Sequence, residues 1–178
     1  EIVIADDGST KETKSRVMSF SKNSEMNIIY SWQEDIGFRA ARSRNSALIK
    51  SSGDYIVFID GDTILDKNFL MDHIAAAEQG YFVQGTRVLL TKQQTKKTLF
   101  DQMVAFPFFS SRFKSRKNSI RSNLLSYFFS NKKNNLRGIK TCNMGFFRKD
   151  CANINGFNNE FEGWGREDSE FAVRLMNS

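Results

Sequence analysis

Short apolar runs alternate with longer amphipathic segments along the first 90 residues of the chain. The runs are rich in β-branched and aromatic side chains and predict strands over residues 2–5, 27–32, 55–59 and 81–90. The segments between them predict helices over residues 9–21, 39–50 and 66–79. Strands and helices that alternate at this spacing are typical of an α/β fold with a mainly parallel central sheet flanked by helices.

The same pattern predicts which faces are buried. Residues 55–59 form a continuous apolar run, as expected for a strand that is covered on both faces. Ser9 or Thr10 is expected to cap the first helix. The positions expected to face the core are Val17, Met18 and Phe20 in the first helix and Ala40, Ala41, Ala47 and Leu48 in the second.

The alternation ends after Leu90. Residues 91–140 are polar, basic and aromatic, with helices predicted near residues 96–106 and 119–129. A strand over residues 141–148 and a final helix over residues 167–176 are predicted beyond them. No run of about 20 uncharged apolar residues occurs, so no segment is expected to span a bilayer.

Charge is distributed unevenly. The chain carries 26 basic and 20 acidic residues, a net charge of +6. Residues 102–149 contain no acid, eleven of the basic residues and eight of the 17 phenylalanines. The remainder has 15 basic and 20 acidic residues, so an acidic body carries one basic, aromatic segment. The net positive charge of the whole chain therefore does not indicate nucleic-acid binding.

The length of 178 residues fits one domain with a sizeable core. Cys142 and Cys151 are too few for a disulfide framework and lack the spacing of a metal site, so reduced thiols are expected. A strand pattern begins at Ile2 and a helical pattern stops just before Ser178. We therefore expect that the sequence is a fragment cut at both ends.

Two acidic turns follow predicted strands. Asp60-Gly61-Asp62 follows residues 55–59, and Asp6-Asp7-Gly8-Ser9-Thr10 follows residues 2–5. Because ligands of open α/β sheets bind beyond the carboxyl ends of strands, both turns are expected at one ligand-binding edge. Paired carboxylates suit Mg²⁺ or Mn²⁺, yet Asp-Gly-Asp is also good turn chemistry. The first turn equally fits a base or ribose contact or a helix cap.

A third acidic cluster opens the last predicted helix. Glu167 and Asp168 follow Gly163-Trp164-Gly165-Arg166. Acids near a helix N-terminus are favoured by the helix dipole, which is a purely structural interpretation. The functional alternative makes one carboxylate a general base and stacks Trp164 on the face of a sugar.

Taken together, these motifs resemble family 2 glycosyltransferases with the GT-A fold. The resemblance rests on the segments Glu1–Thr10, Gly37-Phe38 with Arg44-Asn45, Gly53–Asp62, Cys142–Asp150, Gly156-Phe157 and Trp164–Phe171. The chain is similar in particular to bacterial chondroitin-polymerase-like modules and to the galactosyltransferase C-terminal domain with a GWGGED-type motif. The resemblance implies one domain over residues 1–178: a nucleotide-sugar-binding half (1–90), a basic aromatic helical insert (91–140) and an acceptor-binding, catalytic half (141–178).

The resemblance also implies roles for individual residues. Asp6 and Asp7 would bind the nucleotide, with Asp7 on the uracil. Asp168 would deprotonate the acceptor hydroxyl, and Glu167 would position a sugar beside it. The remaining implied roles are nucleotide-sugar binding for Arg44, Asn45, Asp60 and Gly61, metal binding by Asp62 with Asp60, and a sugar pocket lined by Trp164, Asn143, Gly163 and Gly165. A further histidine ligand of related enzymes would lie beyond Ser178, and His73 is expected at the surface or in packing.

These roles predict an inverting, metal-dependent transferase. It would move a hexose or N-acetylhexosamine from a UDP-sugar to a saccharide or lipid-linked saccharide during synthesis of bacterial surface polysaccharide or lipooligosaccharide, with Mn²⁺ or Mg²⁺ as cofactor. One alternative is a nucleotide-sugar-binding module without turnover. Another is a basic domain that interacts with membranes or nucleic acid, in which the acidic clusters are only turns and caps.

The basic segment has its own alternatives. Within residues 106–140, phenylalanines alternate with lysines and arginines, which suits contact with anionic lipid headgroups. The segment could equally be a helical insert whose basic face is solvated. Nucleic acid is not expected, because no recognised binding module surrounds the segment. The predicted location is cytoplasmic, with peripheral attachment to the inner face of the bacterial inner membrane.

Overall fold

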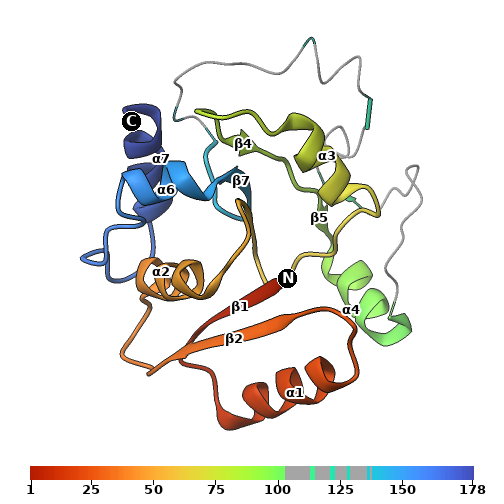
Figure 1. Ribbon diagram of the computed structural model, residues 1–178. Helices are drawn as coiled ribbons and strands as arrows, with labels where there is room; N and C mark the ends of the chain where they lie inside the picture. The colour runs from red at the N-terminus through yellow and green to blue at the C-terminus, as the bar shows by residue number, and fades with distance from the viewer. Residues whose placement is uncertain (103–112, 115–120, 123–127, 129–135, 137) are drawn as a thin grey trace. The chain divides into compact units, whose positions relative to one another are not determined.

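The computed structural model describes residues 1–102, 113–114, 121–122, 128, 136 and 138–178 (Figure 1). It confirms the α/β class. The strands are β1 (Ile2–Asp7), β2 (Ile28–Gln33), β3 (Tyr55–Ile59), β4 (Val83–Gln84), β5 (Leu89–Leu90), β6 (Phe113–Lys114) and β7 (Asn143–Phe147). The helices are α1 (Lys11–Lys22), α2 (Ala40–Lys50), α3 (Phe69–Ala76), α4 (Lys92–Asp101), α6 (Arg148–Asn153) and α7 (Glu167–Met176).

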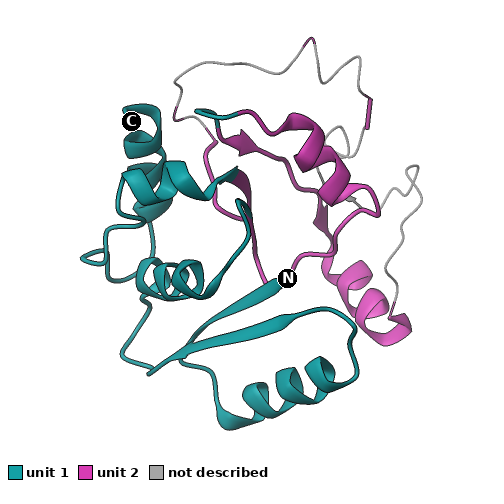
Figure 2. Cartoon of the chain, viewed as in Figure 1, with its two compact units in different colours: residues 1–56, 79–81, 146–178 teal, residues 57–78, 82–145 magenta. Residues whose placement is uncertain are grey.

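Two compact units divide the chain (Figure 2). Unit 1 contains residues 1–56, 79–81 and 146–178, and unit 2 contains residues 57–78 and 82–145. The sequence-based division at residues 90 and 140 stays a prediction.

The parallel pair β1–β2 is the sheet of unit 1. Its register runs from Ile2 opposite Ile28 to Asp7 opposite Gln33. Helix α2 packs against both strands and buries Ala41 and Ala47, two of the four positions expected to face inward, together with Ser43. Ala40 and Leu48 are only half-buried. The carboxyl ends of both strands therefore bring Asp6 and Asp7 beside the last residues of β2.

An aromatic cluster forms the other core of unit 1. The ring of Phe171 stacks on that of Phe157 at 3.9 Å and meets the ring of Phe146 edge-on at 5.3 Å. All three side chains are buried. Helix α7, which has the bounds predicted from the sequence, is fixed by this cluster.

The prediction that side chains of the first helix face the core is wrong. Helix α1 begins one residue after Thr10 and lies along β2, but Met18 and Phe20 are exposed and Val17 is only half-buried. None of its residues is buried, because the two strands beneath it form a narrow surface that covers little of a helix. Thr10 occupies the N-cap position without a side-chain hydrogen bond.

Unit 2 combines short antiparallel pairs. Val83 and Gln84 of β4 pair with Gly145 and Met144 of β7, and β5 pairs with β6. The single strand predicted over residues 81–90 is therefore wrong, because the chain leaves one ladder after Gln84 and joins another at Leu89. Gly85 lies at this break against the side chain of Asn143, where a Cβ atom would overlap it.

Three other predictions need adjustment. β3 has the predicted bounds and shares a sheet with β7 and β4, but it is half-buried and Ile59 is exposed, so it is not covered on both faces. Helix α3 starts later than predicted, because Asp66 accepts the N–H of Asn68 in a turn that precedes it. Helix α4 starts earlier, since Thr91 caps it by accepting the N–H of Gln94.

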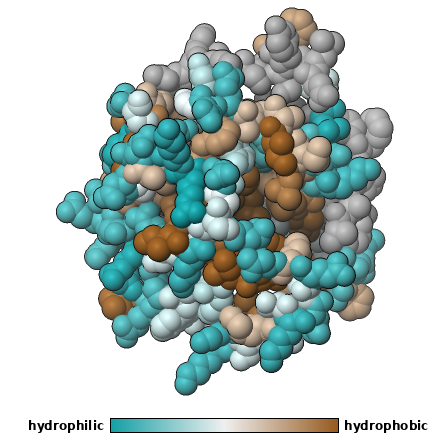
Figure 3. Space-filling view, viewed as in Figure 1, coloured by the Kyte–Doolittle hydropathy of each residue, from teal (hydrophilic) through white to brown (hydrophobic). Residues whose placement is uncertain are grey.

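The predicted helix over residues 119–129 falls almost entirely outside the described residues, as does the end of the one predicted over 96–106. Among the described helices, none is long and apolar enough to cross a membrane. Apolar side chains nevertheless interrupt the polar surface (Figure 3). Exposed examples on α3 and α4 are Leu70, Met71, Ile74, Leu99 and Phe100.

Candidate functional site

The turn after β1 holds Asp6 in a fixed position. Asp6 is buried, and its carboxylate accepts hydrogen bonds from the Tyr30 hydroxyl and, at 2.8 Å, from the Ser9 N–H. Burial, the largest single effect, opposes ionisation, but the two hydrogen bonds outweigh it and lower the pKa of Asp6. Burial and the same contact raise the pKa of Tyr30 to about 12. Asp6 is therefore a charged structural centre of this turn.

Gly8 is required by the shape of the turn. Its φ of +95° lies in the region that side chains disfavour, and an added Cβ would come within 2.5 Å of the Cβ of Asp35. The Asp-Asp-Gly sequence therefore lets the chain turn sharply while residues 35 and 8 remain in contact.

Asp7 is held by groups from β2 and the start of α2. One of its carboxylate oxygens accepts from Gln33 Nε2 at 2.5 Å, and the other accepts from the backbone N–H of Arg39 at 2.6 Å. The guanidinium of Arg39 itself donates to the carbonyl of Glu34. Gln33 lies directly opposite Asp7 in the parallel register, so the sheet itself positions this contact.

Two buried polar atoms on the residues that hold Asp7 have no hydrogen-bond partner in the described part of the chain. They are the Oε1 acceptor of Gln33 and the Nε–H donor of Arg39. Buried polar groups are normally satisfied, so an orphaned acceptor and an orphaned donor on these two residues indicate that a polar ligand or water completes the network.

A second cluster joins α2 to the start of α7. Nη1 of Arg44 lies 3.2 Å from Glu167 Oε1 and 3.1 Å from Asp168 Oδ1. One guanidinium nitrogen thus bridges two neighbouring carboxylates and offsets their mutual repulsion. The side chain of Glu167 is 10% exposed and that of Asp168 is 25% exposed, so Asp168 is the more accessible acid.

Packing fixes the position of Arg44. Its guanidinium carbon lies 5.3 Å from the centroid of the Phe157 ring, the distance of a cation–π contact. Asn45 holds that ring in place, because its side-chain amide donates to the Phe157 carbonyl and accepts the Phe157 N–H, each at 2.8 Å. Asn45 also donates to Asn159 at 2.8 Å. The structure thus shows Asn45 supporting the loop, while its nucleotide role stays a prediction.

The glycine-rich turn before α7 presents Trp164 to solvent. Gly163, Gly165 and Arg166 all have positive φ angles, of 81°, 113° and 69°. The N–H of Gly163 donates to the Phe38 carbonyl at 2.8 Å, while Trp164 is 91% exposed. Because a large aromatic side chain with no packing partner is costly to leave in water, this position suits a stacking surface.

The Asp60-Gly61-Asp62 turn belongs to unit 2 and is open. Asp60 pairs with Nη1 of Arg87 at 3.3 Å, with both side chains 42% exposed, and Asp62 is exposed. The described residues contain no group of three or more acids, histidines or cysteines that could hold a metal ion. Two accessible carboxylates still fit Mn²⁺ or Mg²⁺, because such ions bind through one or two carboxylates plus substrate phosphates.

Asn143, also in unit 2, pairs with a buried histidine. Nε2 of His73 lies 2.8 Å from Asn143 Oδ1, and Asn143 Nδ2 donates to the Thr86 carbonyl at 3.0 Å. His73 was expected at the surface or in packing, and the structure buries it. This contact links α3 to the first residue of β7.

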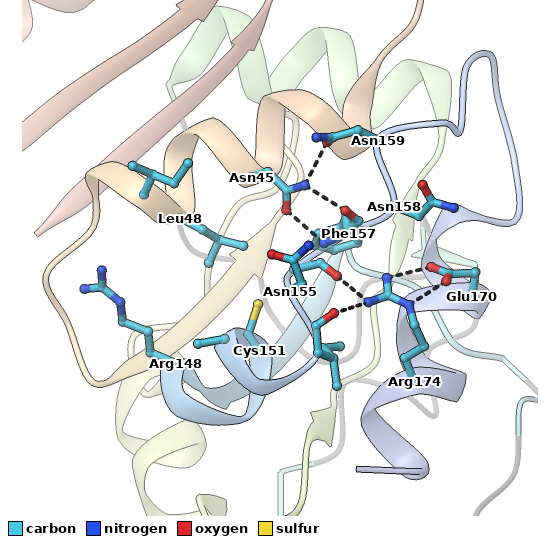
Figure 4. A pocket seen from close by; sticks show the side chains of 14 residues that line it. Asn45, Leu48, Arg148, Cys151, Asn155, Phe157, Asn158, Asn159, Glu170 and Arg174 are labelled. Atoms are coloured by element: carbon cyan, nitrogen blue, oxygen red, sulfur yellow. Dashed lines mark hydrogen bonds and ion pairs between the residues drawn. The ribbon is translucent and has the colours of Figure 1, made fainter.

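A pocket of about 760 Å³ lies among α2, α6, the loop after α6 and α7 (Figure 4). Arg174 crosses it, pairs with both oxygens of Glu170 and donates to the carbonyls of Ile154 and Gly156. Cys151 lines it as a buried thiol whose pKa burial raises to about 11. Because Arg174 pairs with Glu170 and with these two carbonyls, we interpret the lining of this pocket as structural support for α7. Neither Cys151 nor Cys142 is in a disulfide, as expected.

The predicted site residues fall into two sets. Unit 1 holds Asp6, Asp7, Arg44, Asn45, Gly163, Trp164, Gly165, Glu167 and Asp168, and unit 2 holds Asp60, Gly61, Asp62 and Asn143. Sequence reasoning missed four supporting residues: Tyr30, Gln33, Arg39 and Arg87. The parallel pairing of β1 with β2 was the one signal that could have found Gln33, since it places Gln33 opposite Asp7.

Comparison with known proteins gives the following matches. The profile of "Glycosyl transferase family 2" matches residues 1–151. Chondroitin synthase of Escherichia coli is 25% identical over 200 residues, which cover 98% of this chain and 27% of that protein. Validoxylamine A glucosyltransferase of Streptomyces hygroscopicus subsp. jinggangensis is 33% identical over 76 residues, 43% of this chain and 18% of that protein.

A third relative is glycosyltransferase GlyA of Streptococcus pneumoniae, 36% identical over 70 residues, 39% of this chain and 10% of that protein. The aligned regions thus span between 10% and 27% of the lengths of these three relatives.

Proposed function

The chain belongs to glycosyl transferase family 2, and from this we propose that it transfers a hexose or N-acetylhexosamine from a UDP-sugar to a saccharide acceptor with inversion. The observation that carries the proposal is the span of the family match. Residues 1–151 include both the Asp6-Asp7 turn and the Asp60-Gly61-Asp62 turn. Two of the three relatives described above are named as glycosyltransferases, and the third is named as a chondroitin synthase.

The nucleotide side of the proposal rests on the network around Asp7. Gln33 and the Arg39 backbone hold the carboxylate, and the orphaned Gln33 Oε1 and Arg39 Nε–H lie in the same network. The edge of a uracil ring carries both an N–H donor and carbonyl acceptors. The Gln33 Oε1 acceptor and the Arg39 Nε–H donor are complementary to these groups. Asp6 serves this site indirectly by fixing the turn.

The catalytic side rests on the Arg44 cluster. A sugar hydroxyl is a poor nucleophile, so a carboxylate must take its proton as it attacks the anomeric carbon. Asp168 is the more exposed member of the pair, so we assign it as the base. Glu167, buried against Arg44, would orient a sugar and keep Arg44 in place. Attack from the face opposite UDP inverts the anomeric centre.

Asp60 and Asp62 are the residues that would hold a divalent cation. When bound, Mn²⁺ or Mg²⁺ supplies neutralisation of the charge that develops on the leaving diphosphate. Asp62 is exposed and Asp60 pairs with the partly exposed Arg87, so both carboxylates are accessible to such an ion.

The biological setting follows from acceptor chemistry. We place the enzyme in synthesis of a bacterial surface polysaccharide or lipooligosaccharide, on the cytoplasmic face of the inner membrane. The phenylalanine- and lysine-rich residues 106–140 would contact anionic headgroups there. Most of this segment lies outside the described residues, so its sequence alone supports the contact.

Calorimetric titration with UDP, with and without Mn²⁺, tests the proposal. We expect UDP binding that the cation strengthens and that Asp62→Ala weakens in the presence of the cation. Incubation with a panel of UDP-sugars and saccharide acceptors then measures transfer. Cation-dependent binding without transfer to any acceptor would favour a nucleotide-sugar-binding module. Absence of UDP binding would refute both the transferase and the binding module.

Flotation with phosphatidylglycerol vesicles tests the membrane contact. Equal flotation after charge reversal at Arg112, Lys114, Arg116 and Lys117 would refute this contact.

A further inference from the structure

A small pocket in unit 2 carries a positive lining. Its volume is about 260 Å³, and its lining residues are Gln84, Gly85, Thr86, Arg87, Leu89, Gly138, Lys140 and Cys142. Two of these are cations and none is an acid. We call it the basic pocket. The 760 Å³ pocket of unit 1 differs, because there Arg174 is paired with Glu170 in the lining itself.

Gln84 builds the wall of the basic pocket. Its side-chain amide donates to the Lys140 carbonyl at 3.0 Å, and its Oε1 accepts the Lys140 N–H at 3.0 Å. This reciprocal pairing mimics one rung of a β-ladder and fixes the backbone of Lys140 beside β4. The same amide nitrogen also donates to the carbonyls of Gly85 and Asn143. The backbone position of Lys140 is therefore set by the fold.

The pocket borders two groups already assigned to the reaction. Arg87 pairs with Asp60, one of the proposed cation-binding carboxylates. Thr86 accepts from the side chain of Asn143, a predicted sugar-pocket residue. The Arg87–Asp60 pair is partly exposed, and such pairs contribute at most about 1 kcal/mol, so a ligand anion can compete for Arg87.

Size and charge together define the occupant. Pockets for drug-sized ligands have volumes of about 300–1,000 Å³. The basic pocket is smaller than this range, so it suits one sugar ring and not a complete nucleotide-sugar. We propose that it binds an acidic sugar of the acceptor, through a carboxylate or phosphate that Arg87 and Lys140 neutralise. This inference rests on the proposed glycosyl transfer and deepens it by naming the acceptor class.

Matched monosaccharides test the proposal on the whole chain. Methyl β-glucuronide, glucose 6-phosphate and neutral methyl β-glucoside are titrated separately and followed by protein NMR. We expect one of the two acidic sugars to bind at least about tenfold more tightly than methyl β-glucoside. Added salt should reduce this difference in affinity. The preferred acidic probe distinguishes a carboxylate acceptor from a phosphate acceptor.

Variants then assign the effect to the pocket. Lys140→Gln and Arg87→Gln are each expected to remove most of the acidic preference. Lys97→Gln, which changes an exposed lysine on α4, is the matched control and should keep it. The proposal would be overturned by equal affinity for acidic and neutral probes or by no measurable binding of either acidic probe. It would also be overturned by an acidic preference that survives when Lys140→Gln and Arg87→Gln are combined in one chain.

Calorimetry with UDP and Mn²⁺ on the same wild-type and Lys140→Gln samples separates this inference from the proposed function. Retained UDP binding with no acidic preference refutes only the acceptor class. Lost UDP binding in the wild type refutes the glycosyl-transfer proposal, whatever the sugar titrations show.

Discussion

The acidic residues of the two units are held in opposite ways. In unit 1, Asp6, Asp7, Glu167 and Asp168 each have a fixed hydrogen-bond or ion-pair partner, and three of the four partners to Asp6 and Asp7 come from the neighbouring strand or the segment after it. In unit 2, Asp62 is exposed and Asp60 has a partly exposed pair with Arg87.

The roles proposed for the two sets account for this difference. Groups that must hold a defined geometry for a base or for proton transfer are pre-positioned by the fold, which lowers the cost of reaching the reactive arrangement. Carboxylates that await a cation are better left accessible, because rigid pairing with protein cations would compete with the ion. Four experiments test whether the two acidic sets are held for these different purposes.

The largest effect is expected at the proposed base. Asp168→Asn removes the proton acceptor while keeping the size of the side chain, and a general base typically contributes about 10²- to 10⁴-fold to rate. We expect kcat to fall by that factor in a transfer assay, with UDP affinity unchanged. Asp54→Asn, an exposed carboxylate on the loop before β3, is the matched control and should leave kcat near the wild-type value. Full transfer by Asp168→Asn would remove the base assignment.

A loss of cation dependence is expected next. Asp62→Ala should weaken UDP affinity in the presence of Mn²⁺ by about 10- to 100-fold, the range found when groups that support a metal are removed. In EDTA the variant and the wild type should bind UDP alike. Calorimetry in both buffers measures this, and an equal cation response in the variant would show that Asp62 is no ligand.

The two arginine–carboxylate contacts should differ in stability. Arg44→Gln leaves two neighbouring carboxylates without their bridging cation and should lower the free energy of unfolding by about 1.5–3 kcal/mol. Arg87→Gln removes an exposed pair and should cost less than about 1 kcal/mol. Urea denaturation compares them. Equal losses would mean that the two acidic sets are not held differently.

A small effect that depends on pH is expected at Tyr30. Tyr30→Phe deletes one hydrogen bond to Asp6 and should cost about 1 kcal/mol at neutral pH. Because the folded pKa of Asp6 is lowered, the stability from this contact is present above the ordinary value of 3.8 and is lost as pH falls below it. Because the pKa of Tyr30 is raised to about 12, stability is also lost as pH rises from 10 to about 12.

Urea midpoints across this pH range test the prediction for Tyr30. The variant should lose the alkaline dependence and reduce the acid dependence, since the Ser9 N–H still bonds Asp6. Unchanged pH profiles would show that the contact does not stabilise the fold.

Several elements of the fold could be predicted from the sequence because local residue patterns mark them. The β1, β3 and α7 segments were located by apolar runs and by the acids that open α7. The misjudged features depend on distant partners. Whether Met18 and Phe20 are covered depends on the width of the sheet beneath α1, and the break after Gln84 depends on which strands β4 and β5 pair with. No local pattern encodes these pairings.

The candidate site shows the same limit. Carboxylates and glycines can be recognised by residue type and spacing, so Asp6, Asp62, Gly165 and Asp168 could be proposed as site residues from the sequence, and their roles stay predictions. The residues that hold Asp6 and Asp7, Tyr30 and Gln33, act through contacts that span 24 and 26 positions of sequence. Neither side chain belongs to a distinctive local motif, and a single sequence offers no way to pair it with its carboxylate.

The Gln84–Lys140 pairing has a consequence for how this family can vary. It ties together two points 56 positions apart, and so closes the base of a segment that includes residues 102–139 of the acid-free stretch. The free energy of closing a loop rises by only about 0.6 kcal/mol for each doubling of its length. Residues added or removed between the two anchors, outside the helix, strands and pocket residues described above, should therefore cost little stability, so the Gln84–Lys140 pairing marks a place where a new recognition sequence can be inserted.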